Sequence, residues 1–371
     1  MQLQKHNDLE SYLDSVYVLS HSYNTVIAYK GGVLKFRNFV KSKYQITDLE
    51  LVNEIKNERC DVYQIFKDFV VYLDKLEYSP QTIKLALAAV KGYLRHLGVK
   101  VYSEDLKQEV RIPKKSIVRE EAVTKEMLVR LLHKAPAKLQ AAILVATASG
   151  MRVGELVQIR ISDINFDLKP TKIRIRAEIT KTREARETFL TQEATVALKD
   201  YLKHYFDWKE GKNNDALRNI AIFGRTSKII KEFIRKPDRK SPPYMTAVNC
   251  LDQSLKRTIK KIPEFDRKNE NSRSLVHFHS FRKFFRTMAS EAVGRDYAEA
   301  LMGHHFYLDT YYTLAEERKS EMYEKAEPYL TISDFTKIEK TLKGISEKQE
   351  ELEAKVARLE KNAIQVPDFL E

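Results

Sequence analysis

The apolar residues of the first hundred positions recur every three or four residues, and this spacing constrains the fold more than any other feature. Between Asp61 and Glu77, one such stripe consists of Val62, Ile65, Phe66, Phe69, Leu73 and Leu76. A stripe with the period of a helix predicts an amphipathic helix that packs one face on a core. Ser79 and Pro80 predict the start of the next helix, because serine caps helix N-termini and proline suits the first helical position.

Further helices complete the N-terminal part of the prediction. A helix is expected over about 23–43, although Gly31 and Gly32 lower its intrinsic propensity. The helix that begins at Pro80 is expected to end at Gly98, in a left-handed cap. We therefore expect a small helical domain over residues 1–112. The polar segment 107–121 has no hydrophobic periodicity and is predicted to be a linker.

A second domain is predicted over residues 113–331, again with helices first. Residues 138–149 are apolar nearly all round, which indicates a buried helix that Gly150 ends. The clearest strand is 172–180, where apolar and charged residues alternate, and a second strand is expected over 186–190. The fold class is therefore mainly α with a small β-sheet (α+β), with a basic-faced hairpin on a helical body.

Charge is concentrated in the second predicted domain. The whole chain of 371 residues has a net charge of +13, and residues 113–331 hold 42 basic against 29 acidic side chains. Segment 209–286 alone holds 20 basic and 8 acidic side chains. A solvated lysine-rich face is the plain alternative, but an excess in one stretch favours a surface that binds a polyanion such as DNA.

Composition excludes several other classes of protein. The chain has only two cysteines, Cys60 and Cys250, which excludes a disulfide scaffold and a cysteine-based zinc module. The longest apolar run, 141–148, is too short for a membrane span, and the N-terminus shows no apolar signal core. We expect a soluble protein of the cytoplasm, associated with the nucleoid and without a membrane partner.

Polar residues that could act on a phosphate gather in four short segments. These residues are Arg152, Lys181, His279, Arg282 and His304, with Tyr311 and Tyr312 shortly after the last histidine. In the third segment, a core stripe of Phe281, Phe284, Phe285 and Met288 is expected to turn His279, Arg282 and Arg286 together onto another face. Gly303 is expected to end a helix that starts at about Arg295, which leaves His304 in the turn.

Metal and nucleotide chemistry have little support in the sequence. His277, His279, His304 and His305 lack the spacing of helical metal ligands, and no HExxH motif or cysteine pair accompanies them. A GxxxxGK[ST] loop is also missing. We therefore expect no metal, no nucleotide cofactor and no other cofactor.

The ordered set of arginine, lysine, histidine, arginine, histidine and tyrosine resembles the tyrosine recombinase family of phage integrases and Xer proteins. The resemblance covers roughly residues 8–330 and rests on five boxes: SYNTVIAYKGGVLKFRNF with SPQTIKLALAAVKGYLRHLG, TASGMRVGELVQIRISDI, EITKTREARETFL, HSFRKFF, and LMGH followed by a tyrosine. It implies a SAM-like core-binding domain over 1–112 and a catalytic domain over 113–331.

The chain departs from the family pattern in a few places. Phe281 stands where the family usually has leucine, and Lys283 replaces a common histidine. The distance from His304 to Tyr312 is one residue shorter than usual, so Tyr311 is a second candidate. We favour Tyr312 because a threonine follows it, as is typical of the family tyrosine.

The resemblance implies a site-specific DNA recombinase, such as an integrase of an archaeal mobile element or a Xer-like resolvase. Arg152 and Arg282 would clamp the phosphate, Lys181 would protonate the departing 5′ oxygen, and His279 and His304 would assist. Tyr312 would be the nucleophile and end as a 3′-phosphotyrosine, without ATP or metal. The partners would be double-stranded DNA with a specific target site and three further copies in a tetramer. The alternatives are a type IB topoisomerase and a non-catalytic DNA-binding relic.

The tail, residues 332–371, lies outside this resemblance. Its apolar positions step alternately by three and four residues, which predicts a coiled-coil-like helix with one polar core position, Gln349. Lys348 and Lys355 would face Glu353 and Glu360 of a parallel partner. The alternative is an amphipathic helix packed on its own catalytic domain.

Overall fold

A computed structural model gives the structure of the chain. It describes residues 8–114, 121–211, 217–224, 243–268, 274–304, 315–333, 352–353 and 355–356. The chain forms two compact units, the first over residues 1–119 with 238–242 and the second over 120–237 with 243–371. Each unit has its own hydrophobic core.

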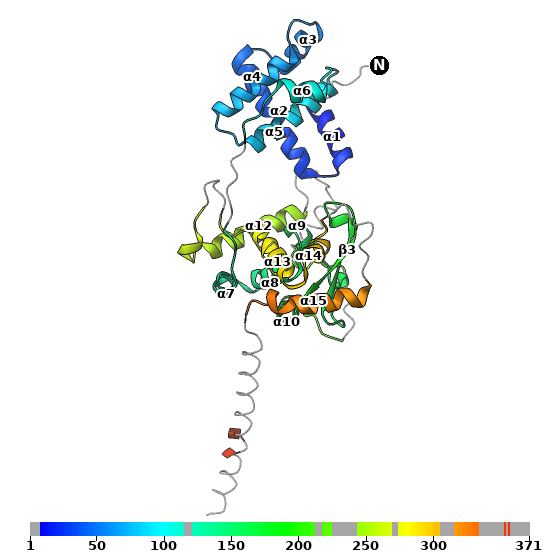
Figure 1. Cartoon of the computed structure of the whole chain (residues 1–371), viewed down its shortest axis with the longest axis vertical. Coiled ribbons are helices and arrows are strands. Elements are labelled where there is room, and N and C mark those ends of the chain that lie inside the picture. The colour runs from blue at the N-terminus through cyan, green and yellow to red at the C-terminus, as the bar shows by residue number, and fades with distance from the viewer. Residues whose placement is uncertain are drawn as a thin grey trace, which may run out of the picture. The chain divides into compact units, whose positions relative to one another are not determined.

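The first unit is helical, as predicted (Figure 1). Its helices are α1 (Asp8–Ser20), α2 (Tyr23–Tyr44), α3 (Asp48–Lys56), α4 (Val62–Lys75), α5 (Pro80–His96) and α6 (Ser103–Glu109). The stripe predicted in α4 is buried apart from its last member, Leu76, and Ser79 caps α5 by accepting the N–H of Thr82. Gly98 adopts the left-handed conformation after α5, with φ of 85°.

Helix α2 runs unbroken through Gly31 and Gly32, and packing explains why. A Cβ added at Gly32 would lie 2.8 Å from the Cβ of Ala89 and 3.1 Å from the Cα of Ala86. Glycine therefore allows α2 and α5 to approach closely, and this contact outweighs the low helix propensity. The predicted linker 107–121 was wrong at its start, since α6 extends to Glu109 and the side chain of Val110 is buried in the same core.

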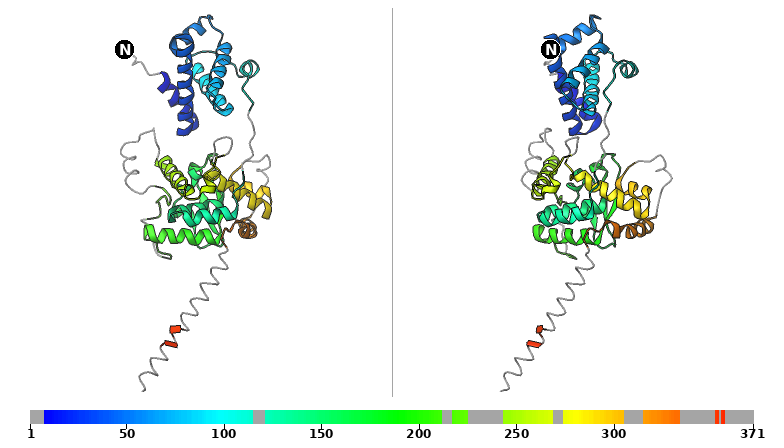
Figure 2. Two further views of the ribbon diagram at one scale, coloured as in Figure 1. Left: turned by 90° about the vertical axis from the view of Figure 1, so that its left-hand side faces the viewer. Right: turned by 60° about the vertical axis from the view of Figure 1, so that its left-hand side comes forward.

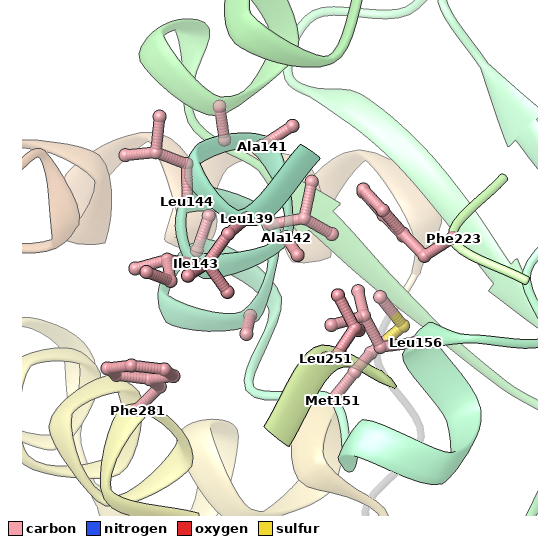
Figure 3. Close-up of a cluster of buried hydrophobic side chains, with 14 of the residues drawn as sticks. Leu139, Ala141, Ala142, Ile143, Leu144, Met151, Leu156, Phe223, Leu251 and Phe281 are labelled. Carbon is pink, nitrogen blue, oxygen red and sulfur yellow. The ribbon is translucent and has the colours of Figure 1, made fainter. Parts of the chain in front are cut away.

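The second unit is built around one buried helix, α8 (Ala137–Ser149), as its apolar sequence predicted. Helices α10 (Gln192–Phe206) and α13 (Phe278–Val293) pack on it, and α8 and α10 run side by side (Figure 2). Figure 3 shows residues of α8 among Phe223, Leu251 of α12 (Pro243–Ile259) and Phe281 of α13. The other α-helices within the described part of this unit are α7 (Lys125–Lys134), α9 (Val153–Leu156), α14 (Arg295–Met302) and α15 (Glu316–Leu330).

A small antiparallel sheet with the order β1-β2-β3 completes the second unit. Its strands are β1 (Ile164–Asn165), β2 (Thr171–Ile175) and β3 (Arg186–Leu190), and Ile173 faces Thr188 in the β2–β3 register. The expected first strand, 172–180, was too long, because a 3₁₀ turn at Ala177–Ile179 follows β2. The class predicted from the sequence, mainly α with a small sheet, is confirmed.

The residues directly after α15 are tied to the core of the second unit. Glu193, in the first turn of α10, accepts the backbone N–H groups of Ile332 and Ser333 at 2.9 and 3.0 Å, and also the Ser333 hydroxyl. The predicted coiled coil lies outside the described residues, except that Leu352, Glu353, Lys355 and Val356 are exposed and helical. No described helix combines the length and apolar character of a membrane crossing.

Candidate functional site: an arginine cluster around two buried carboxylates

The turn between α8 and α9 positions Arg152. Gly150 ends α8 with φ of 64°, and an added Cβ would lie 2.4 Å from the Phe285 ring, so only glycine fits this position. Arg152 follows as the N-cap of α9, with 28% of its side chain exposed. Its Nη1 lies 3.2 Å from Oε1 of Glu155, and its backbone N–H donates to the other carboxylate oxygen at 2.8 Å.

Arg282 enters the site from α13 and is almost fully buried, with 1% of the residue exposed. Its guanidinium donates to the carbonyl oxygens of Gly150 and, at 2.8 Å, Met302. Nη2 also lies 3.0 Å from Nε2 of His304. Burial, together with the positive charge of Arg152, lowers the pKa of Arg282 to about 9, so the side chain stays charged at neutral pH. Arg282 thus joins the α8–α9 turn to the end of α14.

The first buried carboxylate, Glu155, pairs with two arginines. Arg186 of β3 grips it with both ends of its fork, at 3.0 and 2.6 Å, and donates its Nε–H to the carbonyl of Leu301 at 3.0 Å. Burial raises the pKa of Glu155, but the hydrogen bonds and charges of Arg186 and Arg152 outweigh it, and the net pKa is lowered. Glu155 therefore remains ionised and fixes Arg152 and β3 relative to each other.

The second buried carboxylate, Glu299, lies in α14 with 1% of the residue exposed. It accepts a hydrogen bond from the Nε of Arg286 at 2.5 Å and contacts Nδ1 of His304 through its other oxygen. Arg295 lies farther away, at 3.7 Å. His304 directly follows the left-handed Gly303, as predicted, and its side chain is 38% exposed.

The structure brings together three of the six predicted site residues: Arg152, Arg282 and His304. His279 is exposed on α13, with its ring 6.3 Å from that of His277. Of the expected common face of His279, Arg282 and Arg286, both arginines meet the Glu299–His304 pair. The burial of Arg282 was not expected, and the carbonyls of Gly150 and Met302 hold its side chain in the interior.

Of the other predicted residues, the structure describes Lys181. Lys181 is exposed in the turn between β2 and β3, near the predicted tip of the hairpin. Tyr311, Tyr312 and His305 lie outside the described residues.

Three partners of this cluster were not predicted from the sequence: Glu155, Arg186 and Glu299. Glu155 stands three residues after Arg152 at the start of a short helix, which is the spacing at which a carboxylate can accept the N-cap N–H. This spacing could have revealed its role. Nothing comparable identifies Glu299, because its contacts to α13 depend on how α13 and α14 pack.

The cluster as a whole carries an excess of positive charge. Two carboxylates, Glu155 and Glu299, are surrounded by the guanidinium groups of Arg152, Arg186, Arg282 and Arg286. Even with His304 neutral, the four cations exceed the two anions. Such an arrangement can bind an anion with planar, bidentate hydrogen bonds, as a phosphate group requires.

The region that contains this cluster is similar to known proteins. Residues 121–310 match the model of the phage integrase family. Tyrosine recombinase XerA of Pyrococcus furiosus is 27% identical over 206 residues, which are 52% of this chain and 68% of XerA. Tyrosine recombinase XerD of Rickettsia conorii is 22% identical over 191 residues, 49% of this chain and 59% of XerD.

Two solved structures share the fold. A lambda integrase dimer bound to a COC′ core site is 17% identical, with a TM-score of 0.54 over 85% of this chain and 99% of the other. A lambda integrase tetramer bound to a Holliday junction is also 17% identical, with a TM-score of 0.52 over 85% of this chain and 81% of the other. At this identity the likeness shows the fold alone.

Proposed function

This chain belongs to the phage integrase family and is a tyrosine recombinase, and from this premise we propose that it cleaves and rejoins DNA at a specific site through a covalent phosphotyrosine intermediate. The observation that carries the proposal is the excess positive charge of the arginine cluster. Arg152 and Arg282 lie close enough for the charge of one to lower the pKa of the other. A phosphate between them would relieve this repulsion.

The proposed clamp consists of Arg152 and Arg282. A phosphodiester under attack passes through a pentavalent state with extra negative charge on its non-bridging oxygens, and guanidinium groups match this charge bidentately. The fixed carbonyl partners of Arg282 and the Glu155 contact of Arg152 support the proposal, because they orient both groups before DNA binds. Preorganised donors of this kind stabilise a transition state without reorganisation.

The chemical step uses the remaining predicted residues. The Tyr312 oxygen attacks phosphorus, a Tyr O–P bond forms, and the P–O5′ bond breaks. His279 assists removal of the tyrosine proton, and Lys181 protonates the departing 5′ oxygen. The exposed position of Lys181 in a turn agrees with contact to DNA. In the reverse direction a 5′ hydroxyl attacks phosphorus, the P–O5′ bond forms, the Tyr O–P bond breaks, and the phenol regains its proton. Because the phosphotyrosine ester conserves the bond energy of the diester, ligation needs neither ATP nor metal.

Double-stranded DNA and further copies of the chain are the proposed partners. The helical domain predicted over 1–112 would bind DNA as a core-binding domain, and the basic segment 209–286 would contact phosphates, which gives affinity without sequence choice. We propose that four copies assemble on DNA, and that the tail over 332–371 contributes a weak coiled-coil tether. The tetramer of lambda integrase on a Holliday junction gives a precedent for such an assembly in the same fold.

Covalent trapping from a random pool of duplexes tests the proposal. The full chain is mixed with nicked random-sequence duplexes and denatured, and protein-linked DNA is recovered and sequenced. We expect one sequence to be enriched, with the DNA attached at Tyr312 by peptide mass analysis. Tyr312→Phe, which removes only the hydroxyl, should abolish the adduct, whereas Tyr311→Phe should keep it.

Two results would contradict this assignment in different ways. Adducts that survive Tyr312→Phe and vanish in Tyr311→Phe would move the nucleophile by one position. The absence of adducts from the wild-type chain would refute the covalent mechanism. Strand exchange between two labelled copies of the enriched duplex, rather than relaxation of supercoils alone, would then separate a recombinase from a topoisomerase.

A further inference from the structure

The two hydrogen bonds of His304 define which ring nitrogen carries its proton. The guanidinium of Arg282 can only donate, so Nε2 of His304, at 3.0 Å, must accept. On the other side, Nδ1 faces the carboxylate of Glu299, which only accepts when it is ionised. Burial raises the pKa of Glu299, but hydrogen bonds from His304 and Arg286 outweigh it and lower the net pKa, so the carboxylate is ionised. Without DNA, His304 is therefore neutral and protonated at Nδ1.

This tautomer cannot serve a bound phosphate. A phosphodiester oxygen is an acceptor, and it needs an N–H at Nε2 of His304, where the free chain has a lone pair that accepts from Arg282. If the single proton moved from Nδ1 to Nε2, the Nδ1 lone pair would face the ionised carboxylate of Glu299. Both groups are acceptors, and no proton would lie between them. A second proton on the ring avoids this conflict, since both nitrogens then donate.

We propose that His304 takes up a proton when the scissile phosphate binds, and that Glu299 is the positioning residue that holds the resulting imidazolium as its counter-ion. This inference rests on the proposed function, in which His304 contacts the phosphate. A phosphate oxygen takes the place of Nε2 of His304 as the acceptor for Nη2 of Arg282, so that Nη2 becomes part of the clamp. Phosphate binding would thus provide two donors to the phosphate, Arg282 on α13 and His304 after α14.

The charges around His304 agree with this role for Glu299. Arg282 contacts the ring directly, and Arg286 and Arg295 share the Glu299 carboxylate. The charges of Arg152, Arg186 and Glu155 act on the same cluster. Among these side chains, the cations would oppose a further positive charge on His304, and Glu299 is the anion in direct contact with it. Removal of its charge should therefore disfavour the imidazolium.

The first test reads the ring protons directly by long-range ¹H–¹⁵N correlation of the histidine side chains. It uses the full chain with Tyr312→Phe, which blocks cleavage, and His304→Gln to assign the signal. Without DNA we expect the Nδ1–H tautomer at neutral pH. With the duplex enriched by covalent trapping, we expect both ring nitrogens to be protonated. A ring that stays singly protonated in the complex would overturn the inference.

The second test compares the pH profile of adduct formation in wild type and Glu299→Gln. The amide oxygen of glutamine can still accept the Nδ1–H, so the ring orientation is kept while the charge is lost. We expect the rate to fall at high pH in both proteins. In Glu299→Gln the fall should begin about one pH unit lower or more, which makes this variant about tenfold slower on the falling limb.

A matched control separates charge at the site from charge elsewhere. Glu187→Gln removes a carboxylate of β3 that pairs with Lys172 at 2.8 Å, and it should leave the profile unchanged. A purely structural role of Glu299 would lower the melting temperature without moving the profile, and this result would overturn the inference. The absence of adducts from wild type would instead refute the proposed function, and the inference with it.

Discussion

Replacement of Arg282 by lysine keeps the charge and removes the planar fork. In the wild type, two different nitrogens of the guanidinium reach the carbonyl oxygens of Gly150 and Met302. A single ammonium nitrogen cannot take both positions, so at least one hydrogen bond from a charged donor is lost. Such a bond contributes about 1.5–3 kcal/mol to stability. For a unit of this size we expect the melting temperature of Arg282→Lys to fall by roughly 3–12 °C.

The effect of Arg282→Lys on cleavage should be larger than its effect on stability. Loss of one preorganised donor to a transition-state oxygen costs about 10²-fold or more in rate. Adduct formation is measured under single-turnover conditions, well below the melting temperature of the variant, so that unfolding does not contribute to the difference. Arg318→Lys is the matched control, because Arg318 forms an exposed pair with Glu321. A rate of Arg282→Lys within a few-fold of this control would refute the clamp.

Four further perturbations test other parts of the site and the chain. Arg152→Lys should slow adduct formation by about 10²-fold with a smaller loss of stability than Arg282→Lys, since Arg152 is partly exposed; equal losses of stability would contradict this. EDTA should leave adduct formation intact, and abolition would indicate a metal-dependent mechanism. The pKa of Glu155 is lowered in the folded state, so its contribution to stability is present above the ordinary glutamate pKa of 4.5 and is lost as the pH falls below it. Glu155→Gln should therefore be less stable at neutral pH, and its melting temperature should fall less steeply with acidification than that of the wild type. An equally steep fall would refute the pairing. Deletion of 334–371 should weaken self-association by sedimentation, with and without DNA, while half-site cleavage persists; unchanged association would refute the tether.

Local sequence patterns predicted most of the helices because their causes are local. The stripe of α4, the Ser79 cap and the left-handed glycines at the ends of α8 and α14 each depend on neighbouring residues. The sequence also indicated Arg152, Arg282 and His304, which the structure brings together. The pattern was less reliable in the strand, since the alternation continued through residues 176–180 where the backbone turns.

What the sequence could not reveal depends on tertiary packing. Gly32 has a low helix propensity, and its place in α2 is explained by the close contact with Ala89 of another helix. The burial of Arg282 was not predicted, because it depends on the carbonyl of Gly150, which is distant in the sequence. Glu299 and Arg186 each contact residues of another element, and no periodicity within one segment encodes such a pair.

Glu193 has a mechanical consequence for the chain beyond the second unit. Its carboxylate accepts the N–H groups of both Ile332 and Ser333, while its own backbone belongs to the first turn of α10. A pull on the residues after Ser333 would therefore load these hydrogen bonds first and pass the force to α10, which packs against the central helix α8. Force would reach the core of the unit by this route before it could unwind α15. Glu193 thus anchors the start of the tail to the second unit and would bear a force applied to the tail.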